Sequence, residues 1–390
     1  MIRAFAALLL LGGCTTISRD AAPPAHQAAA WVQFDTTGIT ASGADGMAAP
    51  GRHLTIDDPV RIASISKLVV ALGVMRLVEQ GVLDLDADVS RHLGWELRNP
   101  AFPDAPVTLR YLLSHTSGLR DDVDYALPLD VTLRDAIADP KAFAPGHPPG
   151  AFFKYSNLGF PVIATVMERA TGERFDRLMG RLVIRPLGLS ACFNWPSCSD
   201  ATLARAVVLT EPDGTPIRDD LGGRQPACPV VPARDGSCDW QAYRIGTNGA
   251  LFSPQGGLRI SARDLAAVGR LIINRGRHNG AAFLSPAGIA EMTGPQWTFD
   301  GSNGDSEAGF YCAYGLGVQI LAYCPPRDDL FGDARPHLGH AGDAYGLKSG
   351  LWIDGNRGVA YFATGIADDA PRGRTAYRAI EEWLAVRANR

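Results

Sequence analysis

The chain has 390 residues, and its contents of 46% hydrophobic and 20% charged residues are ordinary for a globular protein with a large core. Its net charge is −4, and no block of basic residues occurs, so neither nucleic-acid binding nor polybasic membrane binding is indicated. We expect one large domain or two lobes.

Residues 1–13 place one arginine before a short apolar run that ends in small residues. This pattern predicts a secretory signal peptide, because the run is too short to span a bilayer. The ending Leu11–Cys14 resembles a bacterial lipobox, which implies cleavage before Cys14, lipidation of that cysteine, and anchoring in the periplasm at the outer membrane. A secreted protein without a lipid is the alternative. Residues 14–30 lack apolar periodicity and predict a flexible tether.

The domain itself is expected over residues 31–390, with strands at both ends and helices between them. Strands are predicted at 31–39 and near 51–56, and a β-hairpin at 346–361. Helices are predicted at 64–81, 109–114, 132–138, 158–170, 175–182, 261–273, from 285 onward, and at 375–387. This order indicates an α/β (α+β) fold, in which an antiparallel sheet is flanked by helices and a mainly helical and loop lobe is inserted at about 105–245.

Six cysteines remain once Cys14 is set aside, and they form three close pairs in the sequence. The pairs are Cys192/Cys198, Cys228/Cys238 and Cys312/Cys324. Six cysteines allow 15 connectivities, but the low cost of closing short loops favours the three sequential bridges, and export would permit them. Because no pair has zinc-site spacing with nearby histidines, we expect no metal and no other cofactor.

Ser64 and Lys67 carry the strongest chemical signal. A serine at a helix start lies beside free backbone N–H groups, and a lysine one turn later lies on the same side of the helix. Only four of the 37 basic residues are lysine, and lysine, unlike arginine, can lose its proton when it is desolvated. The pattern therefore favours a serine nucleophile with an amine base, against the alternative of an ordinary amphipathic helix.

Two further motifs follow in order, Tyr155-Ser-Asn157 and His340-Ala-Gly342. Together with Ser64-Ile-Ser-Lys67, this arrangement resembles the serine β-lactamase and penicillin-binding-protein superfamily, in the class C-like branch that also holds esterases and D-amino-acid peptidases. The resemblance covers roughly residues 31–388. It implies that Ser64 is the nucleophile and Lys67 the base or proton relay, while Tyr155 shares the proton transfer and Asn157 orients the lysine and binds substrate. Which of Lys67 and Tyr155 takes the proton stays open.

The third motif departs from the usual Lys-Thr-Gly of the superfamily. The resemblance places His340, Gly342 and Asp343 at the substrate, and the backbone N–H groups of Ser64 and Asp343 in an oxyanion hole. A histidine is mostly neutral at pH 7 and holds an anion weakly. We therefore expect esters or small amides as substrates in preference to β-lactams. If Asp343 faces the cleft, it would repel anionic substrates and could attract an amine.

For several other residues, a structural role is an alternative to a role at the site. His115 is expected to be structural and Lys348 to lie at the surface, although Lys348 could also reach a substrate carboxylate. Trp297, Tyr311 and Tyr345 either line the cleft or pack in the core. The leading hypothesis is a lipid-anchored serine hydrolase that forms an acyl-enzyme on Ser64. The alternatives are a β-lactamase or peptidoglycan D,D-peptidase with the same site, and a non-catalytic lipoprotein that binds cell-wall fragments.

Overall fold

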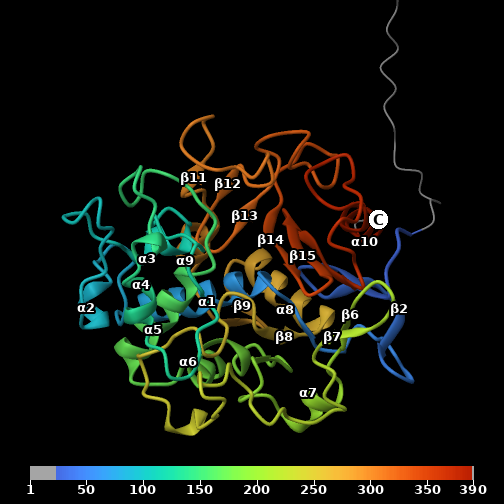
Figure 1. Cartoon of the computed structure of the whole chain (residues 1–390). Coiled ribbons are helices and arrows are strands. Elements are labelled where there is room, and N and C mark those ends of the chain that lie inside the picture. The colour runs from blue at the N-terminus through green and yellow to red at the C-terminus, as the bar shows by residue number, and fades with distance from the viewer. Residues whose placement is uncertain (1–22, 389–390) are drawn as a thin grey trace, which may run out of the picture.

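The computed structural model describes residues 23–388, and its centre is a nine-stranded antiparallel sheet built from both ends of this segment (Figure 1). The spatial order is β11-β12-β13-β14-β15-β16-β1-β2-β3. The strands are β1 (Ala28–Asp35), β2 (Ile39–Ala49), β3 (Arg52–His53), β11 (Trp297–Thr298), β12 (Ala313–Tyr314), β13 (Gln319–Ile320), β14 (Leu338–Ala344), β15 (Leu347–Asp354) and β16 (Arg357–Thr364). This sheet confirms the expected fold class, and β15 with β16 confirms the predicted hairpin.

Strand β1 lies inside the sheet, between β2 and β16. It begins at Ala28, three residues before the predicted strand and within the segment expected to be a flexible tether. The early start of β1 is explained by its pairing with β16. The three alanines 28–30 have little strand propensity of their own, but Ala28 lies opposite Thr364, and pairing with β16 extends the strand. Cys14 and the predicted signal peptide lie outside the described residues.

Helices cover both faces of the sheet. The helix α8 (Ala262–Ile273) packs on β1 and β16, and Gly269 permits the close approach, because a Cβ there would lie 2.3 Å from the Phe34 ring. The helix α10 (Ala379–Ala388) covers the other face and buries Leu384 in one cluster with Trp352 and Tyr361. It begins four residues later than predicted.

The central helix α1 (Ile65–Glu79) runs beside β14 and β15, and its residues from Ile65 to Met75 are all buried. Further helices pack beyond it, at the left in Figure 1. They are α2 (Ser90–Leu93), α3 (Leu109–Leu113), α4 (Leu133–Ile137), α5 (Gly159–Thr171), α6 (Phe175–Met179), which continues as a π-helical turn at Gly180–Ile184, and α9 (Pro286–Thr293). Side-chain caps at Thr108, Thr132, Ser261 and Ser285 start α3, α4, α8 and α9.

Short strands and loops complete the fold. A small sheet joins β4 (Val60–Arg61), β8 (Leu258–Ile260) and β5 (Cys192–Phe193), and a hairpin pairs β6 (Leu209–Thr210) with β7 (Pro216–Arg218). The helix α7 (Asp200–Ala204) and the hairpin of β9 (Arg277–His278) with β10 (Ala281–Ala282) are also short. The three disulfides are the sequential pairs Cys192–Cys198, Cys228–Cys238 and Cys312–Cys324, which confirms the predicted connectivity.

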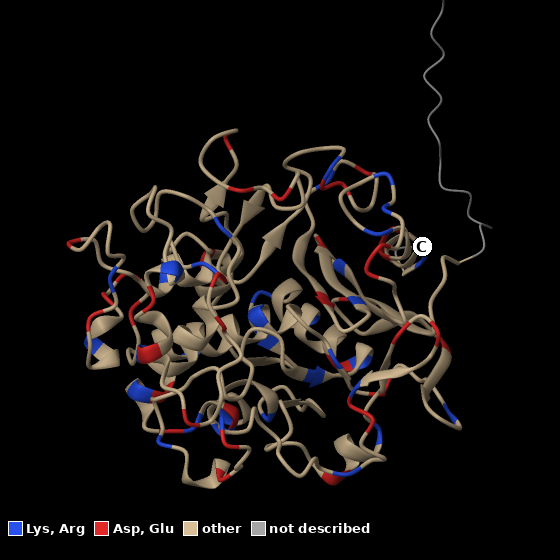
Figure 2. Cartoon of the chain, in the orientation of Figure 1, with Lys and Arg blue, Asp and Glu red and all other residues tan. Residues whose placement is uncertain are grey.

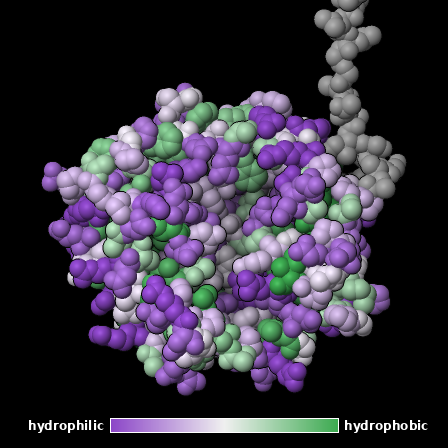
Figure 3. Space-filling view, in the orientation of Figure 1, coloured by the Kyte–Doolittle hydropathy of each residue, from purple (hydrophilic) through white to green (hydrophobic). Residues whose placement is uncertain are grey.

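Charged residues of both signs are spread over the molecule (Figure 2). Between residues 23 and 388, no helix combines the length and the apolar character that crossing a membrane would need. A hollow lies near the middle of the face shown in Figure 3, over the junction of the sheet with α1.

Candidate active site

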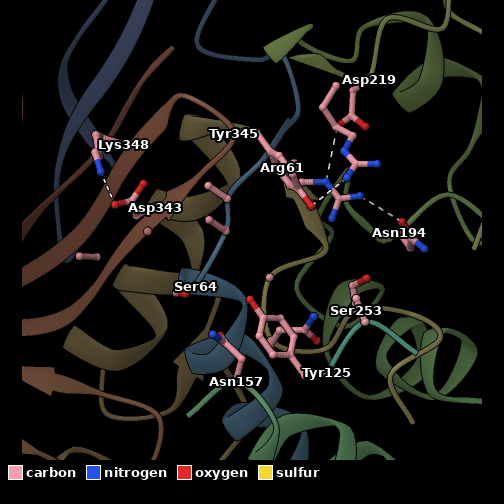
Figure 4. Close-up of a pocket in the computed structure, with 18 of the residues that line it drawn as sticks. Arg61, Ser64, Tyr125, Asn157, Asn194, Asp219, Ser253, Asp343, Tyr345 and Lys348 are labelled. Atoms are coloured by element: carbon pink, nitrogen blue, oxygen red, sulfur yellow. Dashed lines mark hydrogen bonds and ion pairs between the residues drawn. The ribbon is translucent and has the colours of Figure 1, made fainter. Parts of the chain in front are cut away.

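Ser64 lies at the junction of β4 and α1, on the wall of a cavity of about 1140 Å³ (Figure 4). The preceding residue, Ala63, has a φ of 54°, an unfavourable backbone angle for an alanine. Ser66 holds this turn, because its hydroxyl donates to the Ala63 carbonyl at 2.7 Å and accepts from the Leu258 N–H at 3.1 Å. Ser64 is thus presented at the first turn of the helix, as the sequence predicts.

Lys67 is fully buried directly beneath Ser64. Its Nζ donates to Ser64 Oγ at 3.0 Å, to Asn157 Oδ1 at 2.8 Å and to the Gln255 carbonyl at 2.9 Å. Burial lowers the pKa of Lys67 to about 7, although the Asp121 carboxylate acts in the opposite direction. At neutral pH a substantial fraction of this amine is therefore uncharged, so that it can accept the proton of the Ser64 hydroxyl.

Tyr155 completes the group of side chains around Ser64. Its hydroxyl interacts with the hydroxyls of Ser64 and Tyr311, and its ring stacks on the Tyr311 ring with centroids 4.8 Å apart. The Lys67 Nζ lies 4.9 Å from the centre of the Tyr155 ring. Burial raises the pKa of Tyr155 far above that of Lys67, so Tyr155 keeps its proton at neutral pH. Of the two groups that the sequence left open as the base, the lysine is the better suited.

Asn157 connects Lys67 to a residue that the sequence analysis missed. While its carbonyl oxygen accepts from Lys67, its amide nitrogen donates to Asp121 Oδ2 at 2.9 Å. Asp121 also accepts hydrogen bonds from Ser156 Oγ and from the backbone N–H groups of Asn157 and Leu158. Because a carboxylate only accepts, Asp121 fixes which end of the Asn157 amide faces Lys67.

Strand β14 brings the third motif to the nucleophile. Gly342 lies against the residues just before Ser64, and a Cβ there would lie 2.5 Å from the Ile62 carbonyl oxygen. Ser349 on β15 donates to the same carbonyl at 3.0 Å. Beyond Gly339, the edge of β14 that faces away from β15 has no strand partner among the described residues. The backbone of Gly342 and Asp343 therefore lines the cavity beside Ser64.

His340 does not take the place predicted for it at the substrate. Its side chain is 1% exposed and does not line the cavity. Its Nε2 pairs with the Tyr314 hydroxyl at 2.7 Å, and that hydroxyl also meets His115 Nε2 at 3.2 Å. Burial, with Lys67 nearby, lowers the pKa of His340 to about 3, so the ring is neutral. The prediction of direct substrate contact is corrected accordingly, because this polar pair holds the imidazole behind Tyr155.

The remaining candidates divide between cavity and core. Asp343 and Lys348 both line the cavity and form an ion pair, in which the lysine side chain is 9% exposed and the aspartate side chain 70%. Lys348 is thus buried, not a surface residue. Tyr311 and Tyr345 line the cavity, whereas Trp297 does not line it and stacks on Phe153 in the aromatic cluster to which Tyr311 also belongs. His115 is buried, and its ring accepts from the Ser156 N–H, consistent with a structural role.

The comparisons with known proteins agree with this geometry. The family model described as Beta-lactamase matches residues 26–382. The chain therefore belongs to the Beta-lactamase family, a family of serine hydrolases that includes esterases and amidases. The superfamily resemblance seen in the three motifs is confirmed, and the chain is a serine hydrolase by family.

Two curated relatives illustrate the range of this family. Esterase EstB of Burkholderia gladioli is 33% identical over 276 residues, which cover 64% of this chain and 67% of that protein. The D-alanyl-D-alanine-carboxypeptidase/endopeptidase AmpH of Escherichia coli (strain K12) is 27% identical over 186 residues. That alignment covers 45% of this chain and 47% of AmpH, so the match spans about half of each.

Solved structures share the fold over nearly the whole chain. The hydrolase EstCE1, described as having promiscuous acyltransferase activity, has a TM-score of 0.66 and 23% identity and covers 93% of both chains. The D-amino acid amidase from Ochrobactrum anthropi SV3 has a TM-score of 0.65 and 18% identity, again over 93% of both chains. At these identities the likeness concerns the fold.

Proposed function

We propose that this protein is an esterase-like hydrolase that cleaves small esters or amides through an acyl-enzyme on Ser64. The observation that carries the proposal is the buried Lys67, whose Nζ lies 3.0 Å from Ser64 Oγ and whose pKa falls to about 7. A serine alcohol is a weak nucleophile until a base takes its proton, and this lysine is placed and tuned for that task. The 33% identity to an esterase supports the choice of substrate class.

In the first step, Ser64 Oγ attacks the carbonyl carbon while its proton passes to Lys67 Nζ. The backbone N–H groups of Ser64 and Asp343 would hold the oxygen of the tetrahedral intermediate, and one such donor is worth roughly 3–4 kcal/mol of barrier. When the intermediate collapses, the bond to the leaving group breaks. The Tyr155 hydroxyl gives its proton to the departing oxygen or nitrogen and regains one from the Lys67 ammonium, which leaves an acyl group on Ser64.

In the second step, a water molecule attacks the acyl carbon and loses its proton to the same Lys67 and Tyr155 pair. The second tetrahedral intermediate then releases the acid product, and Ser64 recovers its proton. Asn157 and Asp121 act in both steps by holding the Lys67 amine beside the serine. No other group has to titrate for the cycle to close.

The β-lactamase and D,D-peptidase alternatives have less support. A neutral, buried His340 stands where the superfamily usually has a lysine, and the nearby Lys348 is already paired with Asp343. The alternative of a non-catalytic binding protein is disfavoured by the buried Lys67. Desolvating a lysine is costly, and a binding site has no use for an amine held next to a serine hydroxyl.

The test is labelling with a fluorophosphonate probe and, separately, with a fluorescent penicillin. We expect the first to label the protein, Ser64→Ala to abolish the label, and Ser302→Ala, at an exposed loop serine, to retain it. Turnover of 4-nitrophenyl esters by the wild type would support the ester specificity. Rapid labelling or turnover of the penicillin would revive the cell-wall alternatives, and a folded protein that takes neither label would overturn the serine hydrolase mechanism.

We also propose that the chain is exported and lipid-anchored through Cys14 on the periplasmic side of a bacterial outer membrane. The support is the pattern of residues 1–14 together with three disulfides, which form in oxidising compartments. Labelled palmitate should be incorporated into the wild type and not into Cys14→Ser, and the wild type should partition into detergent. Equal partitioning of the two proteins into the aqueous phase would contradict the anchor.

A further inference from the structure

Arg61 forms part of the cavity wall, three residues before the nucleophile. Its side chain is 10% exposed and lines the cavity, on the side opposite Asp343 and Lys348 in Figure 4. Of its five N–H donors, one is engaged by a hydrogen bond to Asn194 Oδ1, at 3.2 Å. The Arg61 Nε is buried without a hydrogen-bond partner, since Asp219 Oδ2 lies 3.7 Å away. Because the Nε atom is buried beside Asp219, the terminal nitrogens of Arg61 are the donors that a ligand in the cavity could meet.

Two more arginines add positive charge at this place. Arg259 is fully buried behind the wall and takes the main hydrogen bond of Asp219, at 2.8 Å. Arg218 on β7 lies in the cavity lining, and its guanidinium is 4.4 Å from the centre of the Tyr345 ring. Burial, and to a lesser extent like-charge repulsion from Arg61 and Arg218, lowers the pKa of Arg259. Arg61 and Arg259 therefore share one buried carboxylate, Asp219, while Arg218 donates to the Tyr345 hydroxyl at 3.0 Å.

The other acidic groups of the cavity do not balance this charge, because they have neighbours of their own. Asp343 pairs with Lys348, and Glu381 accepts from the Arg378 backbone N–H. The charges that act on Glu307 are those of Lys154, Asp305 and Asp121, on the Tyr155 side of the site. Asp124 is solvent-exposed. Two further arginines of the lining, Arg372 and Arg378, donate to backbone carbonyls. Apart from Asp219, no acidic group among the described residues of the lining pairs with Arg61 or Arg218.

We propose that this arginine wall binds an anionic group of the substrate, so that the preferred esters or amides carry a carboxylate a few bonds from the scissile carbonyl. The inference rests on the proposed function and specifies its substrate class. Arginine suits the role, because its planar fork can hold a carboxylate with two parallel hydrogen bonds. A span of three residues keeps the Cα atoms of Arg61 and Ser64 within about 11 Å, so one small molecule reaches both.

The third motif led to a different expectation. A histidine at position 340 holds an anion weakly and favoured esters or small amides over β-lactams, and Asp343 would repel anionic substrates if it faced the cleft. In the structure, Lys348 largely offsets Asp343, and Arg61 lies on the opposite side of the cavity (Figure 4). An anion is therefore accommodated by Arg61 and Arg218, away from His340.

The experiment compares 4-nitrophenyl monoesters of succinate, glutarate and adipate with the methyl ester of each, which lacks the charge. For at least one chain length, we expect the wild type to have at least a tenfold higher kcat/KM for the anionic ester. This ratio should fall at least tenfold in Arg61→Gln and severalfold in Arg218→Gln. It should stay at the wild-type value in Arg91→Gln, an exposed arginine on α2 that carries the same change of charge. Raising KCl from about 0.02 to 0.5 M should also lower the ratio in the wild type, because salt screens the exposed part of the wall.

The outcomes separate this inference from the proposed function. If the wild type cleaves the neutral esters but its ratio is one or below at every chain length, the anion site is overturned and the esterase proposal survives. A high ratio that neither arginine variant lowers also overturns the site. If no ester is cleaved, the esterase proposal fails. Calorimetry with monomethyl glutarate then tests whether Arg61 and Arg218 bind an anion. Binding to the wild type that is lost in Arg61→Gln supports it, and no binding overturns it.

Discussion

Asp121 and Asn157 are joined by two hydrogen bonds, one from the Asn157 backbone N–H and one from its side-chain amide. The two residues are 36 positions apart in the sequence, and neither carries out the bond-breaking chemistry. Their contact nevertheless determines how Lys67 is held, since the Asn157 oxygen that accepts from Lys67 belongs to the amide that Asp121 orients.

Asp121→Asn is the direct test of that contact. An amide at position 121 presents a donor where the carboxylate only accepts, so at least one hydrogen bond to Asn157 or its neighbours is lost. We expect kcat/KM to fall about 10- to 100-fold, the range for a lost hydrogen bond to a charged group. The Asp121 charge raises the pKa of Lys67, so the acid limb of the pH–rate profile should also move to lower pH. Asp122→Asn, at the neighbouring residue paired with Arg120, is the control.

The pH dependence of acylation follows from Lys67. Because only the neutral amine can take the Ser64 proton, kcat/KM should rise with pH and level off above a midpoint at about pH 7. Tyr155, whose pKa is raised by burial, should not contribute a limb below pH 9. A profile measured from pH 5 to 9.5 checks this expectation. A rate that does not change between pH 5.5 and 8.5 would exclude Lys67 as the base.

The same shift of the Lys67 pKa affects stability. The folded pKa of about 7 lies below the unfolded value near 10.5, so the folded protein binds fewer protons than the unfolded chain between these two values. Lys67 therefore adds stability as the pH rises from 7 to 10.5. Relative to the wild type, the free energy of unfolding of Lys67→Met should be highest at pH 7 and below and should decline by up to about 5 kcal/mol towards pH 10.5. Denaturant titrations at several pH values measure it, and a constant difference would contradict the shift.

Tyr314→Phe should destabilise the fold without introducing a cavity. Tyr314 is fully buried, and its hydroxyl lies between the Nε2 atoms of His340 and His115. Removing the hydroxyl leaves two buried ring nitrogens without this partner, at a cost of about 1–3 kcal/mol in the free energy of unfolding. Tyr323→Phe, at a tyrosine that is 42% exposed, should stay within about 0.5 kcal/mol of the wild type. Equal effects in the two variants would mean that the hydroxyl of Tyr314 contributes nothing special.

The Cys228–Cys238 disulfide should matter for substrate binding as well as for stability. Cys228 lines the cavity together with Pro229 and Val230, and the bridge closes a short loop with a sequence separation of 10. The double serine variant should lose about 2–3 kcal/mol of stability by the chain-entropy argument. Because that wall then becomes more mobile, KM should rise by a larger factor than kcat falls. A change confined to kcat would place the effect at Ser64 and not at the cavity wall.

The parts of the molecule that the sequence predicts well are those with local signals. The α1 helix follows from its apolar periodicity and its stop at Gly81, the disulfides from the short spacing of the pairs, and the β15–β16 hairpin from alternation around Asp354 and Gly355. The sequence also predicts that Ser64, Lys67 and Asn157 come together, because the two motifs that hold them resemble those of one family. In each case, the sequence pattern that allows the prediction spans only a short stretch of the chain.

The parts that the sequence does not predict depend on contacts between distant segments. Asp121 lies in a stretch rich in aspartate and proline, where nothing distinguishes it from Asp122 or Asp124 until α5 is packed against it. Arg61 is one of 33 arginines, and only the cavity separates it from the others. The position of His340 was missed for a related reason. Its motif predicts the strand correctly, but the partner that holds the ring, Tyr314, comes from another strand of the sheet.

The order in which the strands are synthesised determines when the active site can be completed. The strand that supports the cavity beside Ser64 is β14, and it joins the sheet through β15 and β16, the last strands to be synthesised. A nascent chain that has already produced Ser64, Lys67 and Tyr155 still lacks the neighbour that completes the site. Reactive serine chemistry is therefore withheld until the chain has been synthesised as far as β16.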